Sequence, residues 1–263
     1  MEEPLPPVLF VTPIREMDII GINRLLDGPK VYIEAGSGSN SKVFETFRNL
    51  IRHFSPYAQR VLSGVMMSPR VPTTTISLHL QKVDTVKTFL YVMQTGIFIP
   101  QWEPTDKIVT PAENVHLALE VAVLADYMQF IGDGMDFAIS SYVRNIIEFG
   151  DRSITTLPIS LVEGVFDCQV TDFSLTRELI AKVLAVDYTK SQLIKTSVSR
   201  GIALQPSIPF QYQELLEVNE EFSQQILAMS NEILLRQSQS HIGDGKIWSK
   251  DLLTNRRILM FKP

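Results

Sequence analysis

The chain has 263 residues, of which 45% are hydrophobic and 20% are charged, and its formal net charge at pH 7 is −5. Such values are ordinary for a globular protein that folds as one large domain or two modest ones. A mildly acidic chain lacks the broad positive field of proteins that bind nucleic acid or anionic lipid. We therefore expect neither a nucleic acid nor a membrane as a partner.

The cysteine content and the N-terminal residues predict where the protein works. The single cysteine, Cys168, cannot form an internal disulfide, which favours a reducing compartment. Its neighbours in the sequence include no cation that would lower the thiol pKa, so we do not expect a catalytic cysteine. No secretory signal and no apolar run of the roughly 18 residues needed for a membrane span is found. We expect a cytoplasmic or nuclear protein.

The first segments of the chain are predicted to be a flexible arm and a helix. Prolines interrupt residues 1–16, although Val8–Val11 could form a short strand. Residues 17–26 follow as a helix that stops at Asp27-Gly28-Pro29. The helix carries more apolar residues than a lone surface helix needs, which fits a face buried either in the domain or in a dimer. These residues are Ile19, Ile20, Ile22, Leu25 and Leu26.

A glycine-rich loop, Gly36–Lys42, lies between two strand-like runs at residues 31–35 and 43–47. It resembles a phosphate loop in composition, and a nucleotide-binding enzyme is the alternative function that this loop suggests. However, both common phosphate motifs need another glycine where this chain has Ser41, and they need a helix directly after the loop. The run after Lys42 is strand-like, so the loop is predicted to be a hairpin connection.

Helix signals are dense between residues 55 and 147. Ser55-Pro56 and Thr110-Pro111 each place a hydroxyl at the N-cap and a proline at the first helical position. Glu113 completes a capping box with Thr110. A helix is predicted from residue 56 to Gly64, followed by a strand at 75–80. The next helix is capped by Asp84 and ends at Gly96, and an edge strand follows at 97–99. Two further helices are predicted, one that starts at residue 111 and one over residues 135–147.

The rest of the chain is predicted to be helical. Helices are expected over residues 158–166 and 175–185, followed by a linker at 201–209. One long helix is predicted over residues 212–236. Its apolar residues do not keep a heptad spacing, so we expect this helix to pack on the chain's own domain and not to form a coiled coil or bind a partner. A turn is expected at 241–245.

No group of residues carries a recognisable catalytic or metal-binding pattern. The four histidines do not share a helix face at the spacing of zinc ligands, and the acidic pairs Glu2-Glu3 and Glu220-Glu221 are predicted to be solvated. No G-x-S-x-G signature is present. We therefore expect no enzyme activity, no metal and no cofactor.

Four stretches in the first 150 residues together resemble a BTB/POZ domain. The stretch VYIEAG is similar to the first hairpin strand of that family. FETFRNLIRHFSPYAQRVLSG, residues 44–64, resembles the family's "SPYF…LSG" region, and VDTVKTFLYVMQTGIFI, residues 83–99, its "FLYTG" segment. LALEVAVLADYMQF, residues 117–130, resembles its "LLELADKYQ" helix. Further on, TTLPISLVEGVFDCQVTDFSLTREL resembles the helical extension of fungal-type BTB proteins.

The resemblance implies an α+β fold, in which a small mixed sheet and a cluster of helices are followed by an all-helical extension. The implied domains are a flexible arm at 1–16, a BTB/POZ domain at 17–148, a helical extension at 149–200, and a long helix with a tail at 201–263. A BTB/POZ domain is a non-catalytic protein-interaction module that commonly forms homodimers through its first helix. On this chain that helix carries Ile19, Ile20, Ile22, Leu25 and Leu26.

The resemblance also suggests an adaptor for a cullin-type ubiquitin ligase. The implied cullin-facing residues are Val65, Met66 and Ser68, and Val65 or Met66 could supply an apolar anchor. The family's loop often carries a glutamate here, and this stretch, Val65–Pro69, has none. The missing carboxylate argues against cullin binding. Phe47 also stands where the family often has a histidine, while the basic residue beside it is kept as Arg48.

Overall fold

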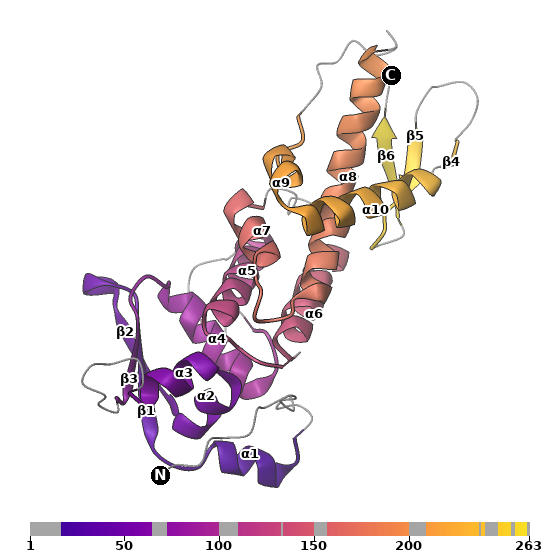
Figure 1. The fold of residues 1–263 in the computed structure, drawn as a ribbon. Helices are drawn as coiled ribbons and strands as arrows, with labels where there is room; N and C mark the ends of the chain where they lie inside the picture. The colour runs from indigo at the N-terminus through magenta and orange to yellow at the C-terminus, as the bar shows by residue number, and fades with distance from the viewer. Residues whose placement is uncertain are drawn as a thin grey trace. The chain divides into compact units, whose positions relative to one another are not determined.

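The computed structural model describes residues 17–64, 73–99, 110–132, 134–149, 157–199, 209–236, 238–239, 247–253 and 256–261 (Figure 1). The chain divides into an N-terminal unit, residues 1–143 with 167–173, and a C-terminal unit, residues 144–166 with 174–263. Both helices and strands are present, as expected for an α+β protein. None of the described helices is long and apolar enough to cross a membrane.

The N-terminal unit contains a small mixed sheet. Its first elements are α1 (Ile19–Leu25), β1 (Lys30–Ala35), β2 (Lys42–Phe47), α2 (Arg48–Phe54), α3 (Pro56–Leu62) and β3 (Thr75–Leu78). The sheet order is β2-β1-β3, with β2 antiparallel and β3 parallel to β1. Val31, Ile33 and Ala35 are fully buried on one face of β1, as the alternation of its residues predicts.

Longer helices complete the core of this unit. They are α4 (Val83–Thr95), α5 (Pro111–Tyr127) and the first part of α6 (Gly134–Phe149). The ring of Phe130, just after α5, stacks on Phe54 of α2 at 5.2 Å and meets Phe89 of α4 edge-on at 6.1 Å. Since offset and edge-to-face aromatic pairs add to the stabilisation from burial, this cluster joins three helical segments into one core.

The helix ends follow the local signals closely. Ser55 and Thr110 are the N-caps of α3 and α5, and the capping box of Thr110 with Glu113 is formed. Gly96 ends α4 in the left-handed conformation, with φ of 69°. Asp84 was expected to cap α4, but this prediction was wrong. The N-cap is Lys82, which makes no side-chain cap, and Asp84 lies inside the first turn, where its charge favours the helix dipole.

The edge strand predicted at residues 97–99 was also wrong, because these residues form no strand. The N–H of Ile97 donates to the hydroxyl of Thr95 at 3.2 Å, so a local turn uses a donor that a sheet would need. Phe98 is instead buried against Tyr142, with ring centroids 4.7 Å apart. The apolar run therefore serves side-chain packing and not strand pairing.

The C-terminal unit is not all-helical, which corrects the expected extension. Its elements are the end of α6, then α7 (Ile159–Phe166), α8 (Ser174–Ser199), α9 (Gln213–Val218), α10 (Glu220–Leu235), β4 (Ser238–Gln239), β5 (Ile247–Lys250) and β6 (Arg257–Phe261). The strands form an antiparallel sheet of order β4-β5-β6 beside α10 and α8 (Figure 1). Ile258 and Met260 of β6 are buried with Ala185 of α8 and Ile233 of α10, so the sheet completes a core that the helices alone leave open.

The long helix predicted over residues 212–236 is in fact two helices. The chain breaks at Asn219, whose backbone is extended and whose side-chain oxygen accepts the N–H of Phe222 at 2.9 Å. Asparagine is a favoured N-cap, so Asn219 starts a new helix. Helix α8, in contrast, runs well beyond the predicted end at residue 185. The predicted arm at 1–16, the linker up to residue 208 and the turn at 241–245 lie outside the described residues.

Candidate functional site

Helix α1 is the first candidate site, because it carries the five apolar residues that the sequence singled out. Asp18 caps it by accepting the N–H of Gly21 at 2.6 Å, and the N–H of Leu26 closes its last turn on the carbonyl of Ile22. Gly28 then reverses the chain into β1 with φ of 99°. The helix is thus bounded by short-range contacts at both ends.

Helix α1 is attached to the rest of the unit through its C-terminal end. The side-chain amide of Asn49 in α2 donates to the carbonyl of Asp27 at 2.9 Å and to that of Arg24 at 3.4 Å. The N–H of Arg48 donates to the carbonyl of Pro29 at 3.0 Å. These bonds fix where the helix ends. Sequence reasoning missed Asn49, since an asparagine in a helix carries no signal for a partner more than 20 residues away.

No residue of α1 is buried, although the helix is rich in isoleucine and leucine. Ile19 is 77% exposed and Ile20 is 62% exposed. Ile22, Leu25 and Leu26 are half-buried. The alternative that all five pack into the domain core was therefore wrong. Ile19 and Ile20 are instead exposed at the start of the helix, and we call the five residues together the α1 surface. Such a surface can bury area against another protein.

The glycine-rich loop is a hairpin connection, as predicted. Lys42 pairs with Ala35 across the antiparallel β1–β2 ladder, and a short 3₁₀ turn, η2 (Gly38–Asn40), lies between them. Gly36 has φ of 77°, and a Cβ there would lie 2.8 Å from the carbonyl oxygen of Asn40, so only glycine fits. The loop leads into a strand, and the helix that a phosphate motif places directly after the loop is not there.

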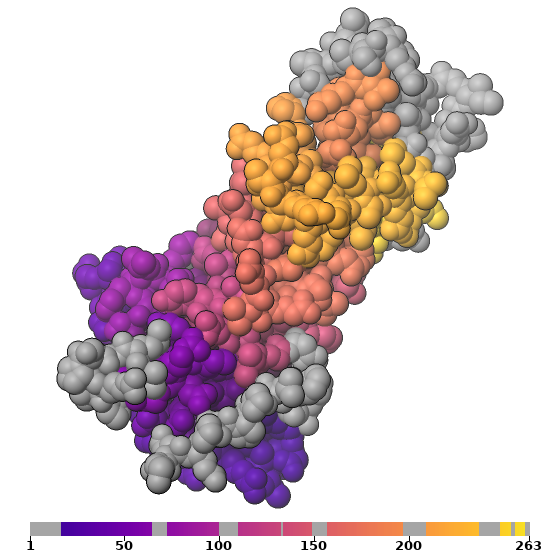
Figure 2. Space-filling model, viewed as in Figure 1, coloured from indigo at the N-terminus to yellow at the C-terminus, as the bar shows by residue number. Residues whose placement is uncertain are grey.

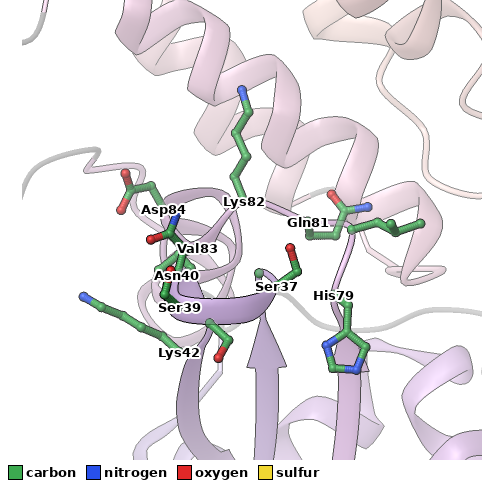
Figure 3. A pocket seen from close by; sticks show the side chains of 12 residues that line it. Ser37, Ser39, Asn40, Lys42, His79, Gln81, Lys82, Val83 and Asp84 are labelled. Carbon is green, nitrogen blue, oxygen red and sulfur yellow. The ribbon is translucent and has the colours of Figure 1, made fainter.

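A shallow hollow of about 540 Å³ lies between this loop and the residues that enter α4 (Figure 3). Its cationic groups do not converge. The side chains of Lys42 and Lys82 point away from one another in Figure 3, and Lys82 pairs with Glu120 of α5. Asp84 adds a negative charge at the start of α4. The two lysines therefore do not converge on one point of the hollow, as the donors of a phosphate loop do.

A pair of tyrosines stands at the surface where α3 meets the end of α5. The rings of Tyr57 and Tyr127 lie 5.3 Å apart and their hydroxyls are 3.5 Å apart. Burial, and then the hydrogen bond with Tyr127, raise the pKa of Tyr57 to about 12. Arg60 of α3 donates to the side chain of Gln129, a non-glycine residue with φ of 53°. These contacts tie α3 to the end of α5.

The segment of residues 167–173 belongs to the N-terminal unit, although the helices on either side of it belong to the C-terminal unit. One carboxylate oxygen of Asp126 in α5 accepts the N–H groups of both Val170 and Thr171, at 2.8 and 2.9 Å. The hydroxyl of Thr171 donates to the carbonyl of Phe130 at 2.8 Å. Cys168 is buried in the same segment.

The described residues contain no cluster of three or more metal-ligating side chains. Burial lowers the pKa of His53 below its usual value. The predicted cullin-facing residues Val65, Met66 and Ser68 lie outside the described part of the chain. Comparisons with protein-family models, with curated proteins and with solved structures found no match to this chain.

Proposed function

We propose that this protein is a non-catalytic protein–protein interaction module of the BTB/POZ type, which forms homodimers through the α1 surface. In this proposal it works in the cytoplasm or nucleus as a scaffold or adaptor, and it needs no cofactor. Its N-terminal unit provides self-association, and its C-terminal unit provides a separate surface for other proteins.

The order of elements supports the BTB/POZ assignment. The resemblance implies a hairpin, a helix capped by Ser-Pro and ended by glycine, a strand, a helix that ends at Thr-Gly, and then a long apolar helix. The described elements β1 to α5 follow this order, including the Ser55 cap, Gly64 with φ of 72°, and the Thr95-Gly96 end of α4. Each of these landmarks is local, and their common order supports one fold.

The observation that carries dimerisation is the exposure of Ile19 and Ile20 on α1. Fully burying an exposed isoleucine side chain contributes about 1.5–3 kcal/mol; because Ile19 and Ile20 are already partly buried, the two together would contribute about 2–4 kcal/mol for each protomer. A two-fold dimer uses the same patch on both subunits. The anchored C-terminal end of α1 leaves its exposed N-terminal half available for such a contact.

The test is the solution mass of the wild-type chain and of an Ile19→Asp/Ile20→Asp variant, measured by light scattering over a wide concentration range. We expect the wild-type protein to have twice the chain mass of 29.7 kDa and the variant to have that mass itself. Leu80→Ser is the matched control, since Leu80 is 98% exposed in the same unit, and it should remain dimeric. A monomeric wild-type protein, or a variant that stays dimeric, would contradict the proposal.

A cullin-type ubiquitin ligase is the assembly that the resemblance suggests for an adaptor. Because the stretch Val65–Pro69 contains no glutamate, we expect an immobilised cullin N-terminal domain to capture little or none of the protein. Capture that Ser68→Glu strengthens would show that the missing carboxylate was an obstacle, since this change places a glutamate two residues after the apolar anchor Met66. A thermal shift with ATP or NAD would instead favour the alternative of a nucleotide-binding enzyme that uses the Gly36–Lys42 loop.

A further inference from the structure

Helix α10 carries two stripes of residues, and only one of them faces the core of the C-terminal unit. The buried stripe contains Phe222, Ile226 and Ile233. The second stripe repeats at alternating intervals of four and three residues and is exposed throughout. It consists of Glu220, Gln224, Leu227, Asn231 and Leu234. Positions with this spacing lie on one side of a helix, which is the arrangement that a partner helix packs against.

The apolar members of the exposed stripe are uncovered. Leu227 is 45% exposed and Leu234 is 39% exposed, seven residues apart on the same side of α10. Leu235 at the end of the helix and Val218 at the end of α9 are 87% and 77% exposed. Figure 2 shows α9 and α10, in orange, on an open face of the C-terminal unit. We call these two helices with their exposed side chains the α9–α10 face.

The charge along α9 and α10 is mostly negative. Between Gln213 and Leu235 there are five glutamates and no lysine or arginine. Glu221 pairs with Arg177, and Glu232 pairs with Arg236. The other three are exposed, and within the described residues they form no ion pair with a basic side chain: Glu214, Glu217 and Glu220. The α9–α10 face therefore combines exposed leucines with uncompensated negative charge.

We propose that the α9–α10 face docks a basic amphipathic helix of another protein. Its apolar residues would cover Leu227 and Leu234, and its lysines or arginines would lie opposite Glu214, Glu217 and Glu220. The same face of a second copy of this chain is disfavoured, because it would bring glutamates against glutamates. The α9–α10 face shares no residue with the α1 surface, so this proposal does not depend on dimerisation.

The test measures binding of the full chain to two labelled synthetic peptides by fluorescence anisotropy. Both are about 18 residues long, which allows a helix to form, and both carry leucines at heptad spacing. One has lysines at the remaining positions and the other has glutamates. We expect the lysine peptide to bind at least tenfold more tightly than the glutamate peptide. Raising NaCl to about 1 M, where the Debye length is about 3 Å, should weaken binding without abolishing it.

Variants separate the apolar contribution from simple charge attraction. Leu227→Ser/Leu234→Ser should lower the affinity for the lysine peptide at least tenfold, while Leu80→Ser, a change of an exposed leucine in the other unit, should leave it unchanged. Glu214→Gln/Glu217→Gln/Glu220→Gln should also weaken binding, and it provides a second test if the leucine variant is unstable. Equal binding of the two peptides, no binding, or unchanged affinity in these variants would overturn the proposal. So would a loss of dimer mass in the leucine variant, since a second copy would then cover the face.

Discussion

Helices α3 and α5 begin with the same device, a hydroxyl N-cap followed by proline, but the two caps lie in different surroundings. Ser55 is fully buried, and its hydroxyl accepts the N–H of Ala58 while donating to the carbonyl of Met128. Thr110 is exposed, and its hydroxyl accepts the N–H of Glu113 at 3.2 Å. One cap therefore joins two parts of the fold that are distant in sequence, and the other stabilises only its own helix.

The difference shows that a local sequence signal does not determine how much a residue contributes to stability. An N-cap satisfies a backbone donor wherever it occurs, and its loss costs about 1 kcal/mol. A buried cap that also serves a distant carbonyl adds the cost of leaving that acceptor unpaired away from water. Three substitutions test whether burial controls the size of the effect in this protein.

The largest effect is expected for Ser55→Ala. It removes the cap of α3 and leaves the carbonyl of Met128 without this donor. We expect the free energy of unfolding of the N-terminal unit to fall by about 2–4 kcal/mol. This free energy can be measured by urea unfolding of the full chain, with hydrogen exchange and mass spectrometry reporting on the segments that belong to the N-terminal unit. Ser63→Ala, at the other end of α3, removes a hydroxyl bonded only to Gln59 and Arg60 of its own helix and should cost less than about 1 kcal/mol. Equal losses in the two variants would contradict the role of burial.

An intermediate effect is expected for Asp126→Ala. The carboxylate is partly exposed and accepts two N–H groups of residues 170–171, one of them partly buried. We expect a loss of about 1–2 kcal/mol and faster hydrogen exchange at Val170 and Thr171. Asp126→Asn keeps one acceptor oxygen and should lose about half as much. Unchanged exchange at these two amides would show that the carboxylate does not hold the segment.

Several helix ends of the N-terminal unit could be predicted from the sequence because the interactions that define them are local. Ser55, Thr110 and Gly96 act on backbone groups within three or four residues. What Ser55 does beyond its own helix could not be predicted, because its second partner, Met128, lies 73 residues along the chain. The exposure of Ile19 and Ile20 was likewise hidden, since a helical stripe looks the same whether or not the fold covers it.

In the C-terminal unit the same kind of reasoning failed at Asn219 and at the strands. The apolar spacing of Leu215, Val218 and Phe222 continues at a helical period across the break, so periodicity alone predicts one helix. The strands β5 and β6 are short, and β6 is buried against α8 and α10, a contact that the pattern of the strands themselves does not indicate. The exposed stripe of α10 can be recognised only once the structure shows that this helix begins at Glu220.

The smallest effect is expected for Thr110→Ala. The substitution removes the side-chain acceptor for the N–H of Glu113, while the carboxylate of Glu113 can still accept the N–H of residue 110 at the helix start. Because water reaches both groups, we expect a loss of only about 1 kcal/mol, and Thr110→Ser should be close to neutral, since serine caps at least as well as threonine. Hydrogen exchange at the first turn of α5 measures the change directly. If Thr110→Ala cost as much as Ser55→Ala, exposure would not reduce the contribution of a cap, and the distinction between the two helices would fail.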